Sequence, residues 1–301
     1  MPLDAARLRV LVEVAHAGSI VAAAKAMSFT PSALSQQLTK LEREVGCPLV
    51  ERGPAGVTLT QAGTALVAHG EIVLGELRAA EQTVRALLGR SPAQLSIGEF
   101  ATAGQTLVPA ALASFRREHP TVRLSLLDLE PPAGYGLVAS GDLDLLITHR
   151  YPGVVLPETV LCRQSLLSDP LRLVLPPDHP AGRASRVRLA DLVDEDWVCG
   201  ETGSPDCVAL RTVAGRPGFP RRVAYETKDY LVSLSLVAAG LGVALVPWSM
   251  LRGQDRSRFL VRGIAGARPA REIYLVHRQR PAPLVLDMVA ALTRSATVMV
   301  D

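Results

Sequence analysis

Three helical patterns follow one another within the opening 60 residues, and this arrangement constrains the fold more than any other feature of the chain. Leu8 and Leu11 recur at helical spacing in a first helix that Gly18 is expected to end. Ser19 stands as the N-cap of an Ala-rich second helix over residues 20–27. Because the side chains of this second helix are small, another helix can pack closely against it. The segment is therefore predicted to form a compact bundle.

The third helix is predicted to begin after Thr30, a favoured N-cap, with Pro31 at its first position, and to run to about Glu44. One face is apolar and buried: Ala33, Leu34, Leu38 and Leu41. The outer face is polar: Ser32, Ser35, Gln36, Gln37, Thr39 and Lys40. Two helices joined by a tight turn, the second with a polar outer face, suit insertion into the major groove of DNA.

An ordinary three-helix bundle with a solvated outer face would show much of the same pattern, and a hairpin signal shifts the balance. Residues 45–60 are typical of a two-stranded hairpin with Arg52 at its tip, as in the wing of a winged helix. Residues 1–60 hold six basic against five acidic side chains, so one copy is expected to bind the DNA backbone weakly. High affinity should therefore need a dimer.

Residues 61–90 are predicted to form a linker helix. An apolar stripe extends over about four heptads: Leu66, Ile72, Val73, Leu77, Ala80, Val84 and Leu87. Gly70 and Gly75 weaken an isolated helix, so a partner must hold it. A second copy of the chain could be that partner, and packing within one chain is the alternative.

From residue 93 the pattern changes to alternating strands and helices. Strands are expected at residues 94–98, 122–127, 145–147, 171–175, 242–246 and 271–277, with helices at 104–118, up to 239 after an Asp229 N-cap, and 283–294. This alternation predicts an α/β domain with parallel sheets. Ligands of such sheets bind where strands end and helices begin.

Candidate effector-binding residues follow from that rule. Thr102 and Ala103 come after the first strand of the domain, and Thr148 and His149 come after the strand at 145–147. Thr202, Thr227 and Val246 occupy comparable loop or strand ends further along. A hydroxyl and nearby amides could hold an anionic or polar group, although each hydroxyl could equally be a plain helix cap.

Enzymatic and metal sites are not indicated by the sequence. The six His are dispersed without metal-ligand spacing, and neither a Gly-x-Ser-x-Gly elbow nor a phosphate-binding Gly-Lys-Ser/Thr loop is present. Gly240-Leu241-Gly242 resembles part of a dinucleotide fingerprint, but Leu245 stands where the third Gly belongs. We therefore expect no catalytic residue, no metal and no cofactor.

The N-terminal residues lack the basic start and apolar run of a signal peptide, and no apolar stretch approaches the roughly 20 residues of a membrane helix. A cytoplasmic protein without a membrane partner is expected. The net charge of +3 is compatible with a nucleic-acid partner without requiring one.

Two cysteines allow a different interpretation. Cys207 lies near the start of an expected helix, where a thiol pKa falls and reactivity toward peroxide rises. Cys199 is expected in a buried strand, no Cys follows Cys207, and the Asp206 carboxylate next to Cys207 opposes a thiolate. A thiol- or peroxide-responsive regulator using Cys207 remains an alternative to plain packing residues.

The N-terminal run resembles the LysR-type transcriptional regulators. The matching residues are Gly18-Ser19-Ile20-Val21-Ala22-Ala23-Ala24, Thr30 to Leu38, Leu41 to Leu49, Glu51-Arg52 and Leu59-Thr60-Gln61-Ala62-Gly63, and the rest of the chain matches more loosely. The resemblance implies base contacts from Pro31, Ser32 and Gln36, and phosphate contacts from Ser35 and Gln37. Position 31 departs from the many relatives that carry Gln there, because Pro offers no donor. Ser19, Thr30, Lys40 and Arg52 complete the expected DNA-binding set.

The resemblance further implies a C-terminal effector domain of two subdomains, similar to periplasmic binding proteins, over residues 93–301. Subdomain I would comprise residues 93–165 and 268–301, and subdomain II residues 166–267, with chain crossings near Leu166 and Val261. The expected partners are dyad-symmetric double-stranded promoter DNA, a small-molecule effector in the cleft between subdomains, and further copies of the chain in a homodimer or homotetramer. RNA polymerase is left open as another partner. A metabolite-binding protein without DNA function is the alternative from another class, and the N-terminal 60 residues argue against it.

Overall fold

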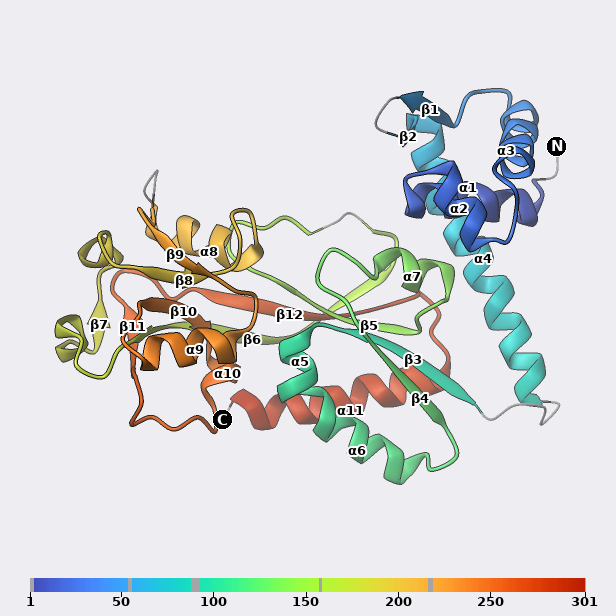
Figure 1. Ribbon diagram of the computed structural model, residues 1–301. Coiled ribbons are helices and arrows are strands. Elements are labelled where there is room, and N and C mark those ends of the chain that lie inside the picture. Colours follow the sequence, from blue (N-terminus) through green and yellow to red (C-terminus); the bar gives the residue numbers. More distant parts are fainter. Residues whose placement is uncertain (1–2, 54–55, 88–92, 157–158, 216–218, 301) are drawn as a thin grey trace.

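The computed structural model describes residues 3–53, 56–87, 93–156, 159–215 and 219–300. The N-terminal domain consists of α1 (Ala5–Ala17), α2 (Ile20–Ala26), α3 (Pro31–Val45), β1 (Val50–Gly53) and β2 (Gly56–Leu59). The two strands pair as an antiparallel hairpin beside the three helices, which confirms the predicted winged helix-turn-helix (Figure 1).

The local capping signals explain where these helices begin and end. Gly18 ends α1 in the left-handed conformation, and the Thr30 hydroxyl accepts a hydrogen bond from the Ala33 amide at 3.2 Å. Ser19 differs from the prediction, because its side chain makes no capping hydrogen bond and only its carbonyl starts α2. The four side chains at the centre of the bundle have no exposed surface: Leu11, Leu34, Leu38 and Leu41.

The wing is fixed to the bundle at several points. Glu42 of α3 accepts a hydrogen bond from the Leu49 amide at 2.9 Å, which holds the start of β1 against the helix. Gly63, in the first turn of the next helix, packs so closely that an added Cβ would lie 1.9 Å from the Leu49 carbonyl oxygen. The wing and α3 are therefore parts of one rigid unit.

The linker helix α4 (Gln61–Leu87) leaves the winged domain and runs past the edge of the C-terminal domain (Figure 1). Its two glycines are contact points within the chain: Gly70 lies against Val12 and Leu8 of α1, and Gly75 lies against Ala139 of α7 (Tyr135–Ser140). The opposite face exposes most of the predicted stripe: Ile72, Val73, Leu77, Ala80 and Val84. The side chain of Leu87 and residues 88–90 lie outside the described part of the chain.

The C-terminal domain alternates strands and helices as expected. Its elements are β3 (Gln94–Glu99), α5 (Ala101–Thr106), α6 (Val108–Glu118), β4 (Arg123–Asp128), α7, β5 (Leu145–Arg150), β6 (Cys162–Leu175), β7 (Arg186–Val187), β8 (Trp197–Cys199), α8 (Pro205–Ala214), β9 (Val223–Glu226), α9 (Tyr230–Ala238), β10 (Val243–Pro247), α10 (Trp248–Leu251), β11 (Leu260–Ile264), β12 (Ala270–His277) and α11 (Pro283–Val300). Two short 3-10 helices, Pro180–Arg183 and Leu189–Leu192, flank β7.

The strands form two lobes that share one mixed sheet, in the order β4-β3-β5-β12-β6-β10-β8-β9. The first lobe contains β3 to β5 and the second contains β7 to β11, while the long strand β6 passes through both. The expectation of parallel sheets is wrong at the centre, because β12 is antiparallel to β5 and β6, and β10 is antiparallel to β6. The parallel pairs lie toward the two ends, where β3 joins β4 and β8 joins β9.

The crossings between lobes fall later in the chain than predicted. Strand β6 pairs with β12 as far as Pro170 and with β10 from Leu171 onward, so the first crossing lies there and not near Leu166. Val261 pairs with Val174 inside the second lobe. The chain therefore returns only where Ala270 starts β12 beside Pro170.

Each lobe has its own apolar core. In the first lobe α6 and α11 lie side by side against the sheet, and Phe115 and Met288 are fully buried (Figure 1). In the second, Trp197 and Phe219 meet edge to face at 5.4 Å between ring centroids. No helix among the described residues is both long enough and apolar enough to cross a membrane.

Candidate DNA interface and effector cavity

The exposed side of α3 lines a shallow cavity with a volume of about 410 Å³. We call this side of the helix the recognition face. The cavity is lined by Ser32, Ser35, Gln36, Thr39, Lys40 and Arg43. Gln36 and Lys40 are exposed, one helical turn apart, and Pro31 and Ser32 are exposed at the N-terminal end. Gln37 is half-buried and does not line this surface. Arg43 lines it although it is not among the predicted DNA-binding residues.

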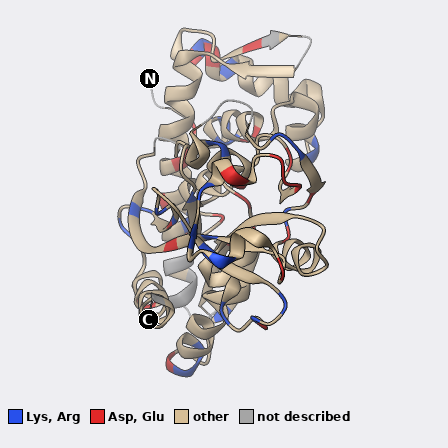
Figure 2. Cartoon of the chain, turned by 90° about the vertical axis from the view of Figure 1, so that its left-hand side faces the viewer, with Lys and Arg blue, Asp and Glu red and all other residues tan. Residues whose placement is uncertain are grey.

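The charges around the recognition face are few and mixed. Arg7 is paired with Glu44 and Asp4, so its charge is already balanced within the protein. Lys40 and Arg43 remain exposed on the recognition face. Basic and acidic positions are interspersed through the winged domain (Figure 2). The side chain of Arg52 lies outside the described part of the chain, although its backbone pairs with Val57 beside the wing tip.

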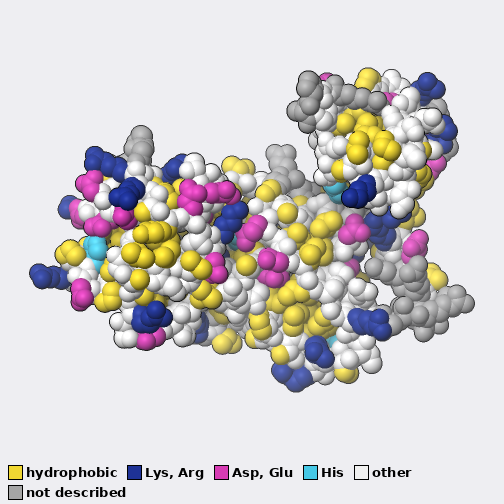
Figure 3. All heavy atoms as spheres, in the orientation of Figure 1, with side chains coloured by type: hydrophobic (Ala, Val, Ile, Leu, Met, Phe, Trp, Pro, Cys, Tyr) yellow, Lys and Arg dark blue, Asp and Glu magenta, His cyan; other side chains and the backbone are white. Residues whose placement is uncertain are grey.

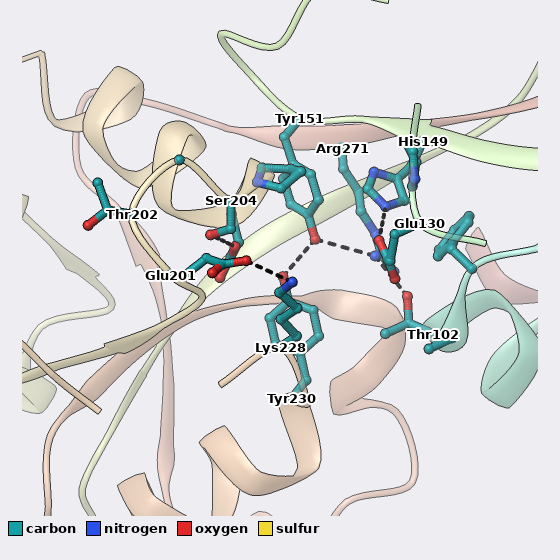
Figure 4. A pocket seen from close by; sticks show the side chains of 16 residues that line it. Thr102, Glu130, His149, Tyr151, Glu201, Thr202, Ser204, Lys228, Tyr230 and Arg271 are labelled. Atoms are coloured by element: carbon teal, nitrogen blue, oxygen red, sulfur yellow. Dashed lines mark hydrogen bonds and ion pairs between the residues drawn. The ribbon is translucent and has the colours of Figure 1, made fainter. Parts of the chain in front are cut away.

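A cavity of about 440 Å³ opens between the two lobes and is called here the effector cavity (Figure 4). The first lobe and the crossing strand contribute Phe100, Ala101, Thr102, Glu130, Pro131, His149, Tyr151 and Arg271. The second lobe contributes Glu201, Thr202, Gly203, Ser204, Pro205, Asp206, Lys228 and Tyr230. Its size is that of ordinary small-molecule sites, and aromatic and charged side chains alternate on its walls.

Three of the seven residues predicted to bind effector line this cavity: Thr102, His149 and Thr202. Thr148 and His149 lie within β5 and not after it, and neighbours in a strand point to opposite faces. His149 faces the cavity, while the Thr148 side chain is buried away from it.

The remaining predicted positions have structural roles. Ala103 and Val246 are buried in the apolar cores of the first and second lobes respectively. Thr227 accepts a hydrogen bond from the Asp229 amide at 3.1 Å, just before α9, and lies outside the cavity. Thr227 therefore stabilises the turn before α9, and Asp229 caps α9 as predicted.

Arg271 lines the cavity and is the centre of its hydrogen-bond network, and no sequence pattern predicts this role. Its side chain is 1% exposed, and its Nε lies 3.0 Å from Oδ2 of Asp169, which is itself 2% exposed. Nη1 donates to the hydroxyls of Thr102 at 2.9 Å and Tyr151 at 3.4 Å. Nη2 donates to Ser249 at 3.1 Å and also faces Asp169 at 3.0 Å. The guanidinium thus donates four hydrogen bonds within the protein and forms an ion pair with Asp169.

The Arg271 network connects the two lobes. Thr102 belongs to α5 of the first lobe, and Ser249 belongs to α10 of the second. The Tyr151 hydroxyl also lies 2.6 Å from the Tyr230 hydroxyl of α9, a contact drawn in Figure 4. Burial raises the pKa of both tyrosines, so both phenols stay protonated at neutral pH.

His149 and Glu130 face each other at the cavity wall, with 3.6 Å between Nε2 and Oε2. Burial lowers the pKa of His149, and the interaction with the nearby His149 ring lowers the pKa of Glu130. At neutral pH a neutral imidazole therefore meets a carboxylate. The His149 ring packs edge-on against Phe100 and Tyr151, and its Nδ1 has no hydrogen-bond partner among the described residues.

The opposite wall also carries paired charges. Lys228 lies 2.8 Å from Glu201, an exposed pair whose hydrogen bond raises the pKa of Lys228 and lowers that of Glu201. Asp206, in the first turn of α8, accepts hydrogen bonds from the Gly200 amide at 2.7 Å and the Ser204 hydroxyl at 2.6 Å. No group of three or more His, Cys, Asp or Glu among the described residues is placed to hold a metal ion.

The thiol interpretation is not supported by the geometry. Cys207 lies in the first turn of α8 as predicted, but its side chain has no exposed surface. Cys199 is buried in β8, and burial together with the neighbouring Cys207 thiol raises the pKa of Cys199. A buried, inaccessible thiol is a poor nucleophile toward peroxide.

A winged helix-turn-helix with a polar recognition face, joined by a long helix to a two-lobed domain with an internal cavity, defines a DNA-binding regulator that senses small molecules. The comparisons with known proteins agree. Residues 5–64 match the family described as bacterial regulatory helix-turn-helix protein, lysR family, and residues 89–297 match the LysR substrate binding domain. The chain belongs to the LysR family of transcriptional regulators.

Similar proteins support that assignment over most of the chain. CbbR of Xanthobacter flavus is 32% identical over 245 residues, covering 80% of this chain and 71% of that regulator. The small neutral protease regulatory protein of Streptomyces coelicolor is 31% identical over 244 residues, covering 80% and 72%.

Among solved structures, a full-length OxyR variant of Pseudomonas aeruginosa has a TM-score of 0.64 at 22% identity, covering 99% of this chain and 96% of that one. CbnR in complex with its target DNA has a TM-score of 0.52 at 23% identity, covering 98% and 100%. At these identities the structural likeness shows the fold.

Proposed function

We propose that this regulator binds a dyad-symmetric promoter site through two copies of the recognition face, and that a small molecule in the effector cavity alters its action there. The cavity carries the proposal, because its walls come from both lobes and the Arg271 network bridges them. A ligand that contacts both walls binds the closed arrangement better than the open one and shifts the equilibrium between them.

A homodimer or homotetramer would place two winged domains on one duplex. The exposed apolar stripe of α4 supports pairing of linker helices between copies, since Leu77 and Val84 are 48% and 55% exposed on a single chain. The mixed charge of the winged domain supports the same assembly, because one copy offers few phosphate contacts.

The proposal includes no cofactor and no catalytic step: Arg271 and Asp206 are held by hydrogen-bond partners within the protein and are assigned a binding role. The site of action would be the cytoplasm, where the promoter DNA is. Contact with RNA polymerase is compatible with this role, but no described surface argues for it.

A DNase footprint on the DNA upstream of the regulator's own gene tests the DNA half of the proposal. Gln36→Ala should relax or abolish a protected dyad, because Gln36 lies exposed on the recognition face and can contact base edges. Gln105→Ala is the matched control, since Gln105 is an exposed glutamine on α5 in the C-terminal domain, and its footprint should resemble the wild type. Equal loss of protection in both variants would contradict the assignment of this face.

A further inference from the structure

The charges around the effector cavity do not balance. Five charged residues line it: Glu130, Glu201, Asp206, Lys228 and Arg271. Asp169 lies directly behind Arg271. Among these described residues, four carboxylates therefore face two cations, an excess of two negative charges.

Both cations are already neutralised by partners. Lys228 is paired with Glu201, and Arg271 is paired with Asp169 and donates four hydrogen bonds within the protein. A carboxylate ligand would have to break these interactions and enter a site with excess negative charge. Because burying an unpaired charge is costly, an anionic ligand is disfavoured.

The two carboxylates without a cationic partner lie on opposite walls. Glu130 follows β4 in the first lobe and is paired with the neutral His149. Asp206 belongs to α8 of the second lobe, where backbone and hydroxyl donors hold it. Acidic side chains gather on the face shown in Figure 3, near the junction of the lobes. Closing the cleft brings these two negative charges together, which is electrostatically unfavourable. A cation between the walls would replace this repulsion with attraction.

The neutral groups of the cavity also favour a donor-rich cation. His149 is 5% exposed, and with the Nε2 proton directed at Glu130, its unpartnered Nδ1 is an acceptor. The Arg271 guanidinium already lies over the rings of Phe100 and Tyr151, 5.2 Å and 5.9 Å from their centroids, so the aromatic walls of this cavity accommodate a cation.

Resting on the proposed effector role of this cavity, we infer that the effector is a small organic cation, a molecule with a protonated amine or amidine group. The group lies between Glu130 and Asp206, on opposite walls of the cleft. It donates hydrogen bonds to both carboxylates, and its charge draws the two lobes together.

Two probes of equal size and opposite charge test this inference: benzylamine and benzoate. The full-length protein is titrated with each by calorimetry, and its thermal unfolding midpoint is measured at millimolar probe concentrations. Benzylamine should bind and raise the midpoint, while benzoate should not. Glu130→Gln should weaken benzylamine binding about tenfold, the size of one charge-assisted hydrogen bond. The matched control Glu118→Gln, an exposed carboxylate on α6, should leave binding unchanged.

A cavity-filling variant distinguishes two claims: that the cavity binds the effector, and that the effector is a cation. Ala101 is an exposed lining residue, so Ala101→Trp should fill the cavity and abolish the benzylamine response without disturbing the core. A benzoate response equal to or larger than that of benzylamine, lost in Ala101→Trp, overturns the charge assignment and leaves the effector cavity in place. Absence of any benzylamine response also overturns the assignment. A response that survives Ala101→Trp means that the cavity is not the binding site, and the proposed effector role fails with it.

Discussion

At the scale of the residue, Arg271 depends on Asp169 for its place in the protein interior. Removing the carboxylate leaves a buried guanidinium without a counter-charge, which typically costs about 3–5 kcal/mol of folding free energy. Asp169→Asn should therefore lower the thermal unfolding midpoint of the effector domain by many degrees. Asp191→Asn breaks the exposed pair with Arg188 and should change the midpoint little. Similar shifts in the two variants would show that the buried pair is not a major source of stability.

His149 makes a pH-dependent contribution whose sign follows from its burial. Its folded pKa lies below the unfolded value, so the unfolded chain binds a proton first as the pH falls. Acidification from about pH 7 to about pH 5 should therefore destabilise the wild type more than His149→Gln. His16 acts in the opposite direction, because its hydrogen bond to Glu71 raises its pKa. His16 is present in both the wild type and His149→Gln, so its contribution cancels in the comparison. Parallel curves of unfolding midpoint against pH for the two proteins would contradict the prediction.

Some cavity residues could be predicted from local sequence and others could not. Thr102 and Thr202 were found because they follow or precede regular elements, where ligands of α/β sheets bind. Arg271 lies inside β12, and its partner Asp169 is 102 residues earlier in the chain. Local patterns carry no information about such a pair. The only local sequence signal for Arg271 is that it stands in a strand segment that is otherwise largely apolar.

At the scale of the element, the fit of α4 against α7 depends on Gly75. An added Cβ would lie 2.5 Å from the Ala139 carbonyl oxygen, closer than side chains approach backbone. Gly75→Ala should therefore separate the two helices and increase hydrogen exchange in α7. Alanine alone would stabilise the helix by about 1 kcal/mol, so the sign of the stability change distinguishes steric conflict from helix propensity. Unchanged exchange together with increased stability would mean that the contact adjusts freely.

Element types were predicted better than their lengths and directions. The helix expected over residues 104–118 is two helices, because Pro109 supplies no backbone N–H and a new helix starts at Val108. The strand expected at 171–175 is the 14-residue β6, whose first half lacks a continuous apolar run. Antiparallel pairing at the centre could not be predicted, since strand direction depends on the path between lobes and not on strand composition.

At the scale of the whole molecule, the exposed stripe of α4 predicts how assembly and DNA affinity are linked. Leu77→Glu places a charge in the expected contact between copies and should yield a monomer in light scattering. DNA affinity should then fall by roughly a hundredfold, because the second winged domain is no longer held near its half-site. Ala68→Glu introduces the same charge at an exposed position on the opposite side of α4, nine residues from Leu77, and serves as the control. A monomer that retains full affinity would contradict the coupling.

Strand β12 has one consequence for how this regulator can evolve. Arg271 lies at its start in the effector cavity, and Arg278 follows its end, donating to carbonyl oxygens of Val138 and Leu143 near the linker helix. Side chains of a strand alternate between faces, so gaining or losing one residue between these arginines would reverse the face of one relative to the other. Lineages of this regulator can therefore exchange side chains along β12 to recognise new molecules, but the length of the segment is inherited unchanged.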